Sequence, residues 1–181
     1  MEELKLQTPV QEGRSRLGLS ISDGYMVLGS CFADNIGRKM SELGFDVCVN
    51  PFGTLYNPVS VCNSVARLES AVPFTSADCV RMGAGSGLVC SFSHHTSFAG
   101  KTEEEFLAKA NASLEQASTA WKSASKVLVT LGTSWCFEHL ASGEIVTNCL
   151  KVDPREFARR RLSVSEASLL LKNMVSRFPG K

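Results

Sequence analysis

Apolar residues follow two spacings along this chain, one typical of buried strands and one typical of amphipathic helices. The apolar run at 25–28 ends at Gly29 and predicts a short buried strand that leads into a turn. From 33 to 43 the apolar residues recur three and four positions apart, which predicts a helix, and Gly44 is a suitable stop for it. A strand, a turn of small residues and a helix form the usual opening of an α/β unit.

The clearest helix of the chain is predicted at 102–124. Thr102 and Glu105 have the spacing of a capping box, and acidic residues fill the first turn. The continuous apolar run at 126–132 follows it and is typical of a central parallel strand covered on both faces. Strands are also expected at 45–50, 86–93 and, as a pair around an Ala-Ser-Gly turn, within 134–149, and helices at 59–68 and 163–178, the last capped by Ser163 or Ser165.

This order of elements predicts one α/β domain over residues 1–181, with a mostly parallel sheet between helices. In such folds a further strand follows the last helix, and this sequence ends where that strand is expected. We therefore expect a domain that lacks its C-terminal strand or strands. Such a domain would have an exposed sheet edge, through which copies of the chain could associate.

Composition narrows the class of partner. The net charge of +1 gives no basic field for nucleic acid. The first twenty residues carry charges throughout, unlike a signal peptide, and no apolar run approaches the roughly 20 residues that span a bilayer. We expect a cytoplasmic protein without membrane contact. The seven cysteines include no C-x-x-C pair, which argues against a zinc site and a disulfide framework, and no metal or cofactor is expected.

The first candidate for chemistry is the turn Gly29-Ser30-Cys31-Phe32-Ala33, between the first strand and its helix. Small residues permit a tight turn, and the free N–H groups and dipole of a helix N-terminus favour negative charge. A thiol at such a position is more readily ionised. The alternative is a close-packed turn with a buried cysteine, and spacing alone leaves both interpretations open.

Four blocks of the sequence, taken together, resemble the motifs of the GSCFA family. They are LGSCFADNIGRKMSELGF (28–45), NPFGTLYNP (50–58), VTLGTSWCF (129–137) and TNCLKVDPREF (147–157). The resemblance implies a flavodoxin-like, SGNH hydrolase-like three-layer α/β/α fold related to GDSL-type esterases. It implies an ester hydrolase or acyltransferase without a cofactor, and a small-molecule or O-acyl carbohydrate ester is the generic substrate of the wider class.

The resemblance also suggests a nucleophile. In the wider GDSL class the first strand ends in Gly-Asp-Ser, with the serine as nucleophile. Aligned with that motif, Gly29 takes the glycine, Ser30 the aspartate and Cys31 the serine. This makes Cys31 the first candidate, because a thiol needs less help from a base than a hydroxyl does. Ser30 is the alternative if the turn is shifted by one residue.

The second and third blocks match the regions that hold the oxyanion in GDSL enzymes. Gly53 is the counterpart of their glycine N–H donor, and Ser134 stands where they have an asparagine. Asn148 is a further amide for this role. Without the resemblance, the second block would be read as a rigid turn between prolines. The side chains expected to contact substrate are Asn50, Phe52, Tyr56, Asn57, Thr133, Trp135 and a pair of histidines, His94 and His95.

Two departures from the family pattern weaken the expectation of catalysis. The family reads Asn-Cys-His-Lys where this chain has Leu150 in the histidine position. The Ser-Pro-x-Arg-His-like motif, which supplies the general base in relatives, does not occur in residues 1–181. His94 and His95 could instead belong to an exposed loop or strand end, and His139 is expected to be structural. The hypotheses are an ester hydrolase whose base lies beyond Lys181, and a non-catalytic ligand-binding module or inactive fragment.

Overall fold

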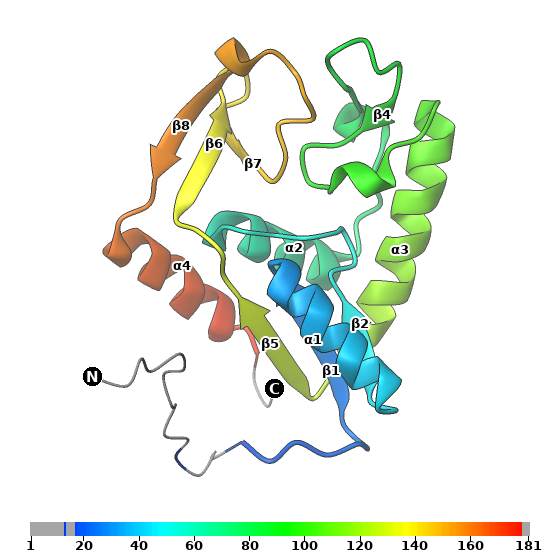
Figure 1. Ribbon diagram of the computed structural model, residues 1–181, viewed down its shortest axis with the longest axis vertical. Helices are drawn as coiled ribbons and strands as arrows, with labels where there is room; N and C mark the ends of the chain where they lie inside the picture. The colour runs from blue at the N-terminus through cyan, green and yellow to red at the C-terminus, as the bar shows by residue number, and fades with distance from the viewer. Residues whose placement is uncertain (1–12, 14–16, 179–181) are drawn as a thin grey trace, which may run out of the picture.

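A three-stranded parallel sheet, in the order β2-β1-β5, lies in the lower half of the view in Figure 1, behind α1. The computed structural model describes residue 13 and residues 17–178. Its helices are α1 (Cys31–Glu42), α2 (Pro58–Ser70), α3 (Glu103–Ser123) and α4 (Val164–Val175), with short 3-10 turns at Ser76–Asp78, Thr96–Phe98 and Pro154–Glu156. Its strands are β1 (Gly24–Gly29), β2 (Asp46–Val49), β3 (Val80–Arg81), β4 (Val89–Cys90), β5 (Lys126–Thr130), β6 (Trp135–His139), β7 (Glu144–Val146) and β8 (Phe157–Arg161).

The central strand β1 divides the core between two faces of the sheet. Tyr25 and Val27 pack with Ala33 of α1 on one face. Met26 and Leu28 belong to the larger core formed with α2 and α3 on the other face. Because successive side chains of a strand point to opposite faces, the uninterrupted apolar run serves both layers of helices. The predicted α/β class is therefore confirmed at this level.

The run at 126–132 is not the central strand that its apolar pattern predicts. It forms β5, which pairs with β1 alone and lies at an edge of the parallel sheet in the described residues. The chain passes from β1 through α1 to β2 on one side, then returns through α2 and α3 to β5 on the other. An apolar run indicates that both faces of a strand are covered, but it does not indicate whether other strands flank it on both sides.

Two small antiparallel sheets stand beside the central one. The hairpin of β3 and β4 belongs to the segment before α3, and β6 lies between β7 and β8. The predicted pair within 134–149 is confirmed as β6 and β7. Strand β8 was not predicted, because three consecutive arginines, Arg159 to Arg161, interrupt any apolar pattern. Among the described residues it pairs only with β6, and an edge strand tolerates such charge.

The helix starts agree with the predicted caps except in one detail. Ser163 caps α4 in a reciprocal capping box with Glu166. The Thr102 hydroxyl accepts from the Glu105 N–H at 3.2 Å, as predicted for α3. The second half of that box is wrong, because the Glu105 carboxylate accepts from the Lys101 N–H instead. The helix still gains two capped N–H groups and an acidic first turn.

Some expectations fall outside the described part of the chain. Residues 1–12 and 14–16, most of the charged opening segment, are not described, nor are residues 179–181 at the other end. Within residue 13 and residues 17–178, no helix has the length and apolar character needed to cross a bilayer. The same residues bring together no group of three or more His, Cys, Asp or Glu side chains suited to a metal ion.

Candidate functional site

The turn after β1 requires glycine at position 29. Its φ of 136° lies in a region that side chains rarely adopt, and a Cβ there would lie 1.9 Å from the carbonyl oxygen of Thr130. The Gly29 N–H donates to Oδ1 of Asn50 at 2.7 Å, and its carbonyl oxygen accepts from the Leu55 N–H at 2.7 Å. Adjacent strands and the second sequence block therefore fix the path of the turn.

Ser30 uses its side chain to begin α1. The hydroxyl accepts from the Phe32 N–H at 3.3 Å and lies 3.2 Å from the hydroxyl oxygen of Thr130. The Ser30 N–H also donates to Thr130. Only 7% of Ser30 is exposed. Its hydroxyl is occupied by the helix cap and by Thr130 of β5.

Cys31 is the first residue of α1, and it is exposed. Within the described chain its own N–H has no acceptor, as expected for the first amide of a helix. The other cysteines are buried or half-buried, and burial raises the pKa of each of their thiols, that of Cys48 to about 11. The turn therefore presents an exposed cysteine beside the free N–H groups of the helix N-terminus, while Ser30 is buried.

Asn50 holds the turn from the end of β2. Its side chain accepts from the Gly29 N–H and donates to a carboxylate oxygen of Asp34 in the first turn of α1. Its backbone has a φ of 39°, and only 7% of the residue is exposed. Sequence analysis did not single out Asp34 or Thr130. Their positions, in the first turn of α1 and at the end of the strand beside β1, are the signals that could have found them.

The residues of the second block serve mainly as structural support for the turn. The Gly53 N–H, expected to hold an oxyanion, donates to the carbonyl oxygen of Asn50 at 2.7 Å. A Cβ on Gly53 would lie 2.2 Å from Cβ of His95, so this glycine is needed for close packing. Phe52 is buried in the core, and Asn57 caps α2 by accepting from the Ser60 N–H.

Tyr56 connects the second block to the third. Its carbonyl oxygen accepts from the N–H groups of Gly132 and Thr133, at 2.9 and 3.0 Å. A Cβ on Gly132 would lie 3.6 Å from Cβ of Ser30, which places the third block against the turn at Gly29–Ala33. The Tyr56 side chain is exposed at this point. The turn and these two blocks, far apart in sequence, thus form one site.

The third block continues into an exposed aromatic face. The Thr133 hydroxyl accepts from the Trp135 N–H at 3.0 Å, and Ser134 is half-buried with its hydroxyl unbonded in the described residues. Trp135 is exposed, with the guanidinium groups of Arg159 and Arg161 at 4.0 and 5.8 Å from its ring centre. These two arginines lie opposite β6 and have no acidic partner among the described residues.

His94 lies away from the turn, in an aromatic box. It has no exposed surface, its Nδ1 lies 2.7 Å from the Ser91 hydroxyl, and its Nε2 has no partner in the described chain. Burial, and secondarily the charge of Arg67, lowers the pKa of His94 to about 3. His94 is therefore a neutral core side chain. The rings around it belong to Phe52, Phe74, Phe98 and Phe106.

The other two histidines have local roles. The Nδ1 of His95 accepts from the Ser97 N–H, which caps a 3-10 turn. His139 lies 3.8 Å from a carboxylate oxygen of Glu156. In the described residues no hydrogen bond joins any histidine to Ser30 or Cys31. A base for the nucleophile therefore does not come from these three side chains in the geometry observed.

The block around Asn148 belongs to the core. The Asn148 side chain accepts from the Leu150 N–H at 2.9 Å and so shapes a tight turn. Leu150 has a φ of 52° and no exposed surface, and it packs in the main hydrophobic cluster. Leu150 therefore serves in packing. In the described chain neither Asn148 nor Leu150 forms a hydrogen bond with the turn at Gly29–Ala33.

Comparison with known proteins adds a family and no nearer relative. A family model described as the GSCFA family matches residues 25–179. No curated protein and no solved structure matches the chain.

Proposed function

Since the chain belongs to the GSCFA family, we propose that it is an SGNH/GDSL-like acyl-transfer protein in which Cys31 attacks an ester carbonyl. One observation carries this proposal. Cys31 is the exposed thiol at the first position of a helix, at the carboxyl end of the central parallel strand. Helix N-terminal N–H groups stabilise negative charge on such a thiol and on an adjacent oxyanion.

The reaction proceeds in two steps. The Cys31 thiolate bonds to the carbonyl carbon, the carbon–oxygen bond to the alcohol breaks, and the alcohol leaves with a proton from solvent. Water then attacks the thioester, which releases the acid, regenerates the thiolate and returns a proton to solvent. The Cys31 N–H is the first oxyanion donor, and the unbonded Ser134 hydroxyl is the second. Tyr56 and Trp135 provide apolar surface for the substrate.

Covalent labelling tests the nucleophile. The protein is treated with 4-nitrophenyl acetate, and intact mass and peptide mapping locate the acetyl group. We expect label on Cys31, loss of label in Cys31→Ala, and retained label in Ser30→Ala and in the control Cys149→Ala, whose thiol is half-buried. Label that survives in Cys31→Ala and disappears in Ser30→Ala would transfer the role to Ser30.

A specific observation also favours a second function, that of a non-catalytic ligand-binding module. Leu150 occupies the family's histidine position and is fully buried, and none of the three histidines forms a hydrogen bond with Ser30 or Cys31 in the described residues. The same helix N-terminus would then hold an acylated or anionic ligand without turnover. Saturable binding of a non-hydrolysable ester analogue, with neither label nor product from the ester itself, would support this function over the first.

A further inference from the structure

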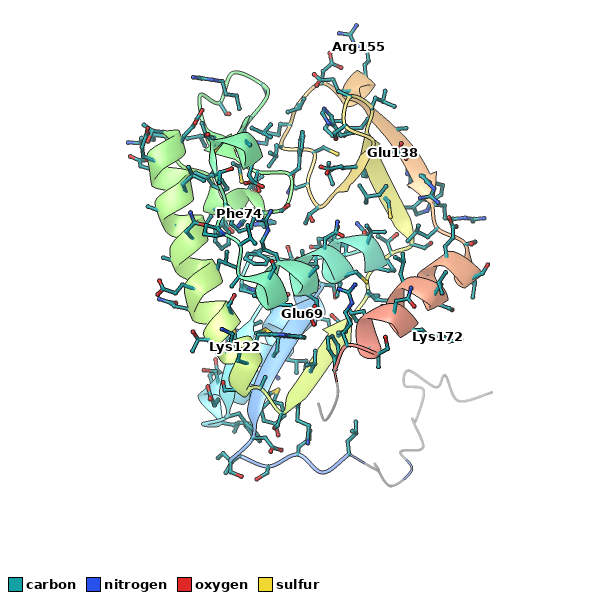
Figure 2. The ribbon with its side chains drawn as sticks, turned by 180° about the vertical axis from the view of Figure 1, so that it is seen from behind. Glu69, Phe74, Lys122, Glu138, Arg155 and Lys172 are labelled. Atoms are coloured by element: carbon teal, nitrogen blue, oxygen red, sulfur yellow. The ribbon has the colours of Figure 1, made fainter. Side chains whose placement is uncertain are left out.

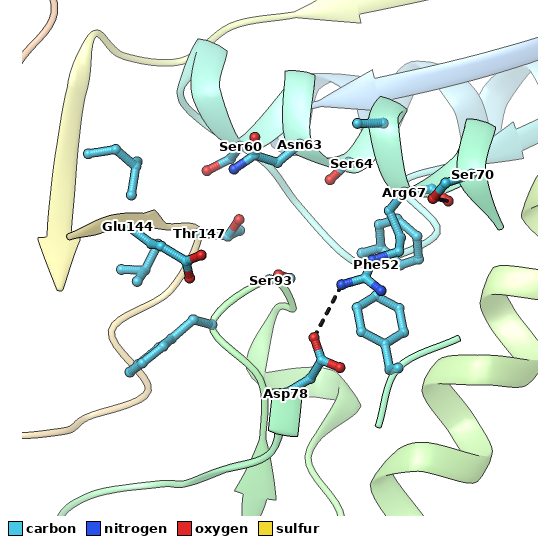
Figure 3. Close-up of a pocket in the computed structure, with 15 residues that line it drawn as sticks. Phe52, Ser60, Asn63, Ser64, Arg67, Ser70, Asp78, Ser93, Glu144 and Thr147 are labelled. Carbon is cyan, nitrogen blue, oxygen red and sulfur yellow. Dashed lines mark hydrogen bonds and ion pairs between the residues drawn. The ribbon is translucent and has the colours of Figure 1, made fainter. Parts of the chain in front are cut away.

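A cavity of about 670 Å³ lies on the face of α2 that is turned toward β7 and the loop before the 3-10 turn at Thr96–Phe98 (Figure 3). Ser60, Asn63, Ser64 and Arg67 recur three and four residues apart along α2, so they share one wall. Ser93, Glu144 and Thr147 face them from the opposite side. The volume falls within the range of about 300–1,000 Å³ typical of small-molecule sites.

The hydrogen-bonding groups of this cavity are largely uncommitted. Ser60 is 1% exposed, lines the cavity, and its hydroxyl has no partner among the described residues. A buried hydroxyl without a partner is unfavourable, and a hydrogen bond to a ligand hydroxyl would remove that cost. The side chains of Asn63, Ser64, Ser93 and Thr147 likewise make no hydrogen bond within the described chain. A wall of hydroxyl and amide groups is suited to a ligand rich in hydroxyls.

The charges around the cavity disfavour an anionic ligand. The Arg67 guanidinium donates to Asp78 at 3.2 Å and to the carbonyl oxygens of Val72 and Pro73, so its charge is paired and part of its donor set is in use. The Glu144 carboxylate has no ion-pair partner in the described residues and would repel an anion. Uncommitted hydroxyls beside a neutralised arginine favour an uncharged ligand.

Aromatic rings supply the apolar part of the site. Phe52, Phe74 and Phe92 line the cavity. Arg67 lies over the ring of Phe74 at 4.3 Å, and Phe74 bonds to Asn111 of α3 through its backbone, which places it between α2 and α3 when the molecule is seen from behind (Figure 2). Phe52 and Phe74 are almost fully buried and hold the cavity wall in place, whereas the half-buried ring of Phe92 can pack against the C–H face of a sugar.

We propose that this cavity binds a neutral saccharide of one or two units. Its hydroxyls bond to the polar wall of α2 and to Ser93 and Thr147, while an apolar face contacts the ring of Phe92. The site is separate from the nucleophile turn and does not depend on Cys31 chemistry. The inference therefore goes beyond the proposed acyl transfer, and it stands or falls on binding alone.

The test is an NMR titration of the ¹⁵N-labelled full chain with glucose, N-acetylglucosamine, cellobiose and maltose. We expect saturable shifts of the backbone amides of Ser60, Ser64, Ser93 and Thr147 with at least one of these sugars. Asn63→Ala should weaken that binding at least fivefold. The matched control Asn173→Ala, an exposed asparagine on α4 far from the cavity lining, should leave it unchanged. Both replacements are at exposed helix positions, so both variants should fold.

Three results would overturn the inference. The first is no shift of the cavity amides with any of the four sugars. The second is equal binding by wild type, Asn63→Ala and a second cavity variant, Thr147→Val. The third is tighter binding of glucuronate than of glucose, which would assign the cavity to anions. Because no outcome requires turnover, failed labelling of Cys31 and failed sugar binding are separate findings.

Discussion

Asn50 is the side chain on which the turn at Gly29–Ala33 depends most directly. It accepts from the buried Gly29 N–H at 2.7 Å and donates to Asp34, and its backbone has a φ of 39°. In Asn50→Ala the Gly29 N–H loses its acceptor, which costs about 1–2 kcal/mol. Alanine in the left-handed region costs roughly a further 1 kcal/mol. We therefore expect a loss of about 2–3 kcal/mol in the free energy of unfolding.

Two further replacements at this position separate the cost of the lost hydrogen bond from the cost of the left-handed backbone. Asn50→Gly relieves the backbone term and keeps the loss of hydrogen bonds, so it should lose roughly 1 kcal/mol less than Asn50→Ala. Asn50→Asp keeps an acceptor for Gly29 but places a second carboxylate beside Asp34. Its stability should therefore improve as the pH falls from neutral and the introduced carboxyl becomes protonated.

The assay is urea denaturation followed by far-UV circular dichroism at neutral pH, with Asn173→Ala as the control for loss of an exposed asparagine. The rate at which iodoacetamide alkylates Cys31 is measured on the folded variants, and it should change in Asn50→Ala because the turn is no longer held. A loss below about 0.5 kcal/mol in Asn50→Ala, the range of ordinary surface substitutions, would refute this account of the turn.

The remaining predictions concern the core and the turn glycine. The folded-state pKa of His94, about 3, lies below its ordinary value of 6.5, so the unfolded chain binds more protons between these values. Stability should thus be full above about pH 6.5 and fall by roughly 3 kcal/mol by about pH 4, and His94→Phe should remove this component of acid denaturation, whereas an unchanged acid profile in His94→Phe would assign it to other groups. Leu150→Ala should lose about 3 kcal/mol in urea denaturation because Leu150 is fully buried, and a loss below about 1 kcal/mol would mean that the site collapses around the smaller side chain. Gly29→Ala should prevent a stable fold, because its Cβ would meet the Thr130 carbonyl, whereas the control Gly44→Ala, at φ 88° and free of backbone contacts, should cost only about 1–2 kcal/mol; equal losses by thermal melting would show that φ alone matters.

Local pattern in the sequence determined most of the elements of this protein. The spacing of apolar residues located β1 and the four helices, because a helix or strand buries a face whose period depends only on its own geometry. Caps such as Ser163 were equally local. The position of Cys31 at a helix start after a buried strand also followed from neighbouring residues alone.

Contacts between distant segments had to be decided by the tertiary structure. An apolar run does not indicate lateral neighbours, so the edge position that β5 has in the described residues was not predictable. The arginines of β8 concealed a strand that pairs with β6. Likewise, only the folded chain brings Thr130 against Ser30 and so separates its buried hydroxyl from the exposed thiol of Cys31. Hydrogen bonds between residues a hundred positions apart depend on sheet order and close packing, and neither property is written in local periodicity.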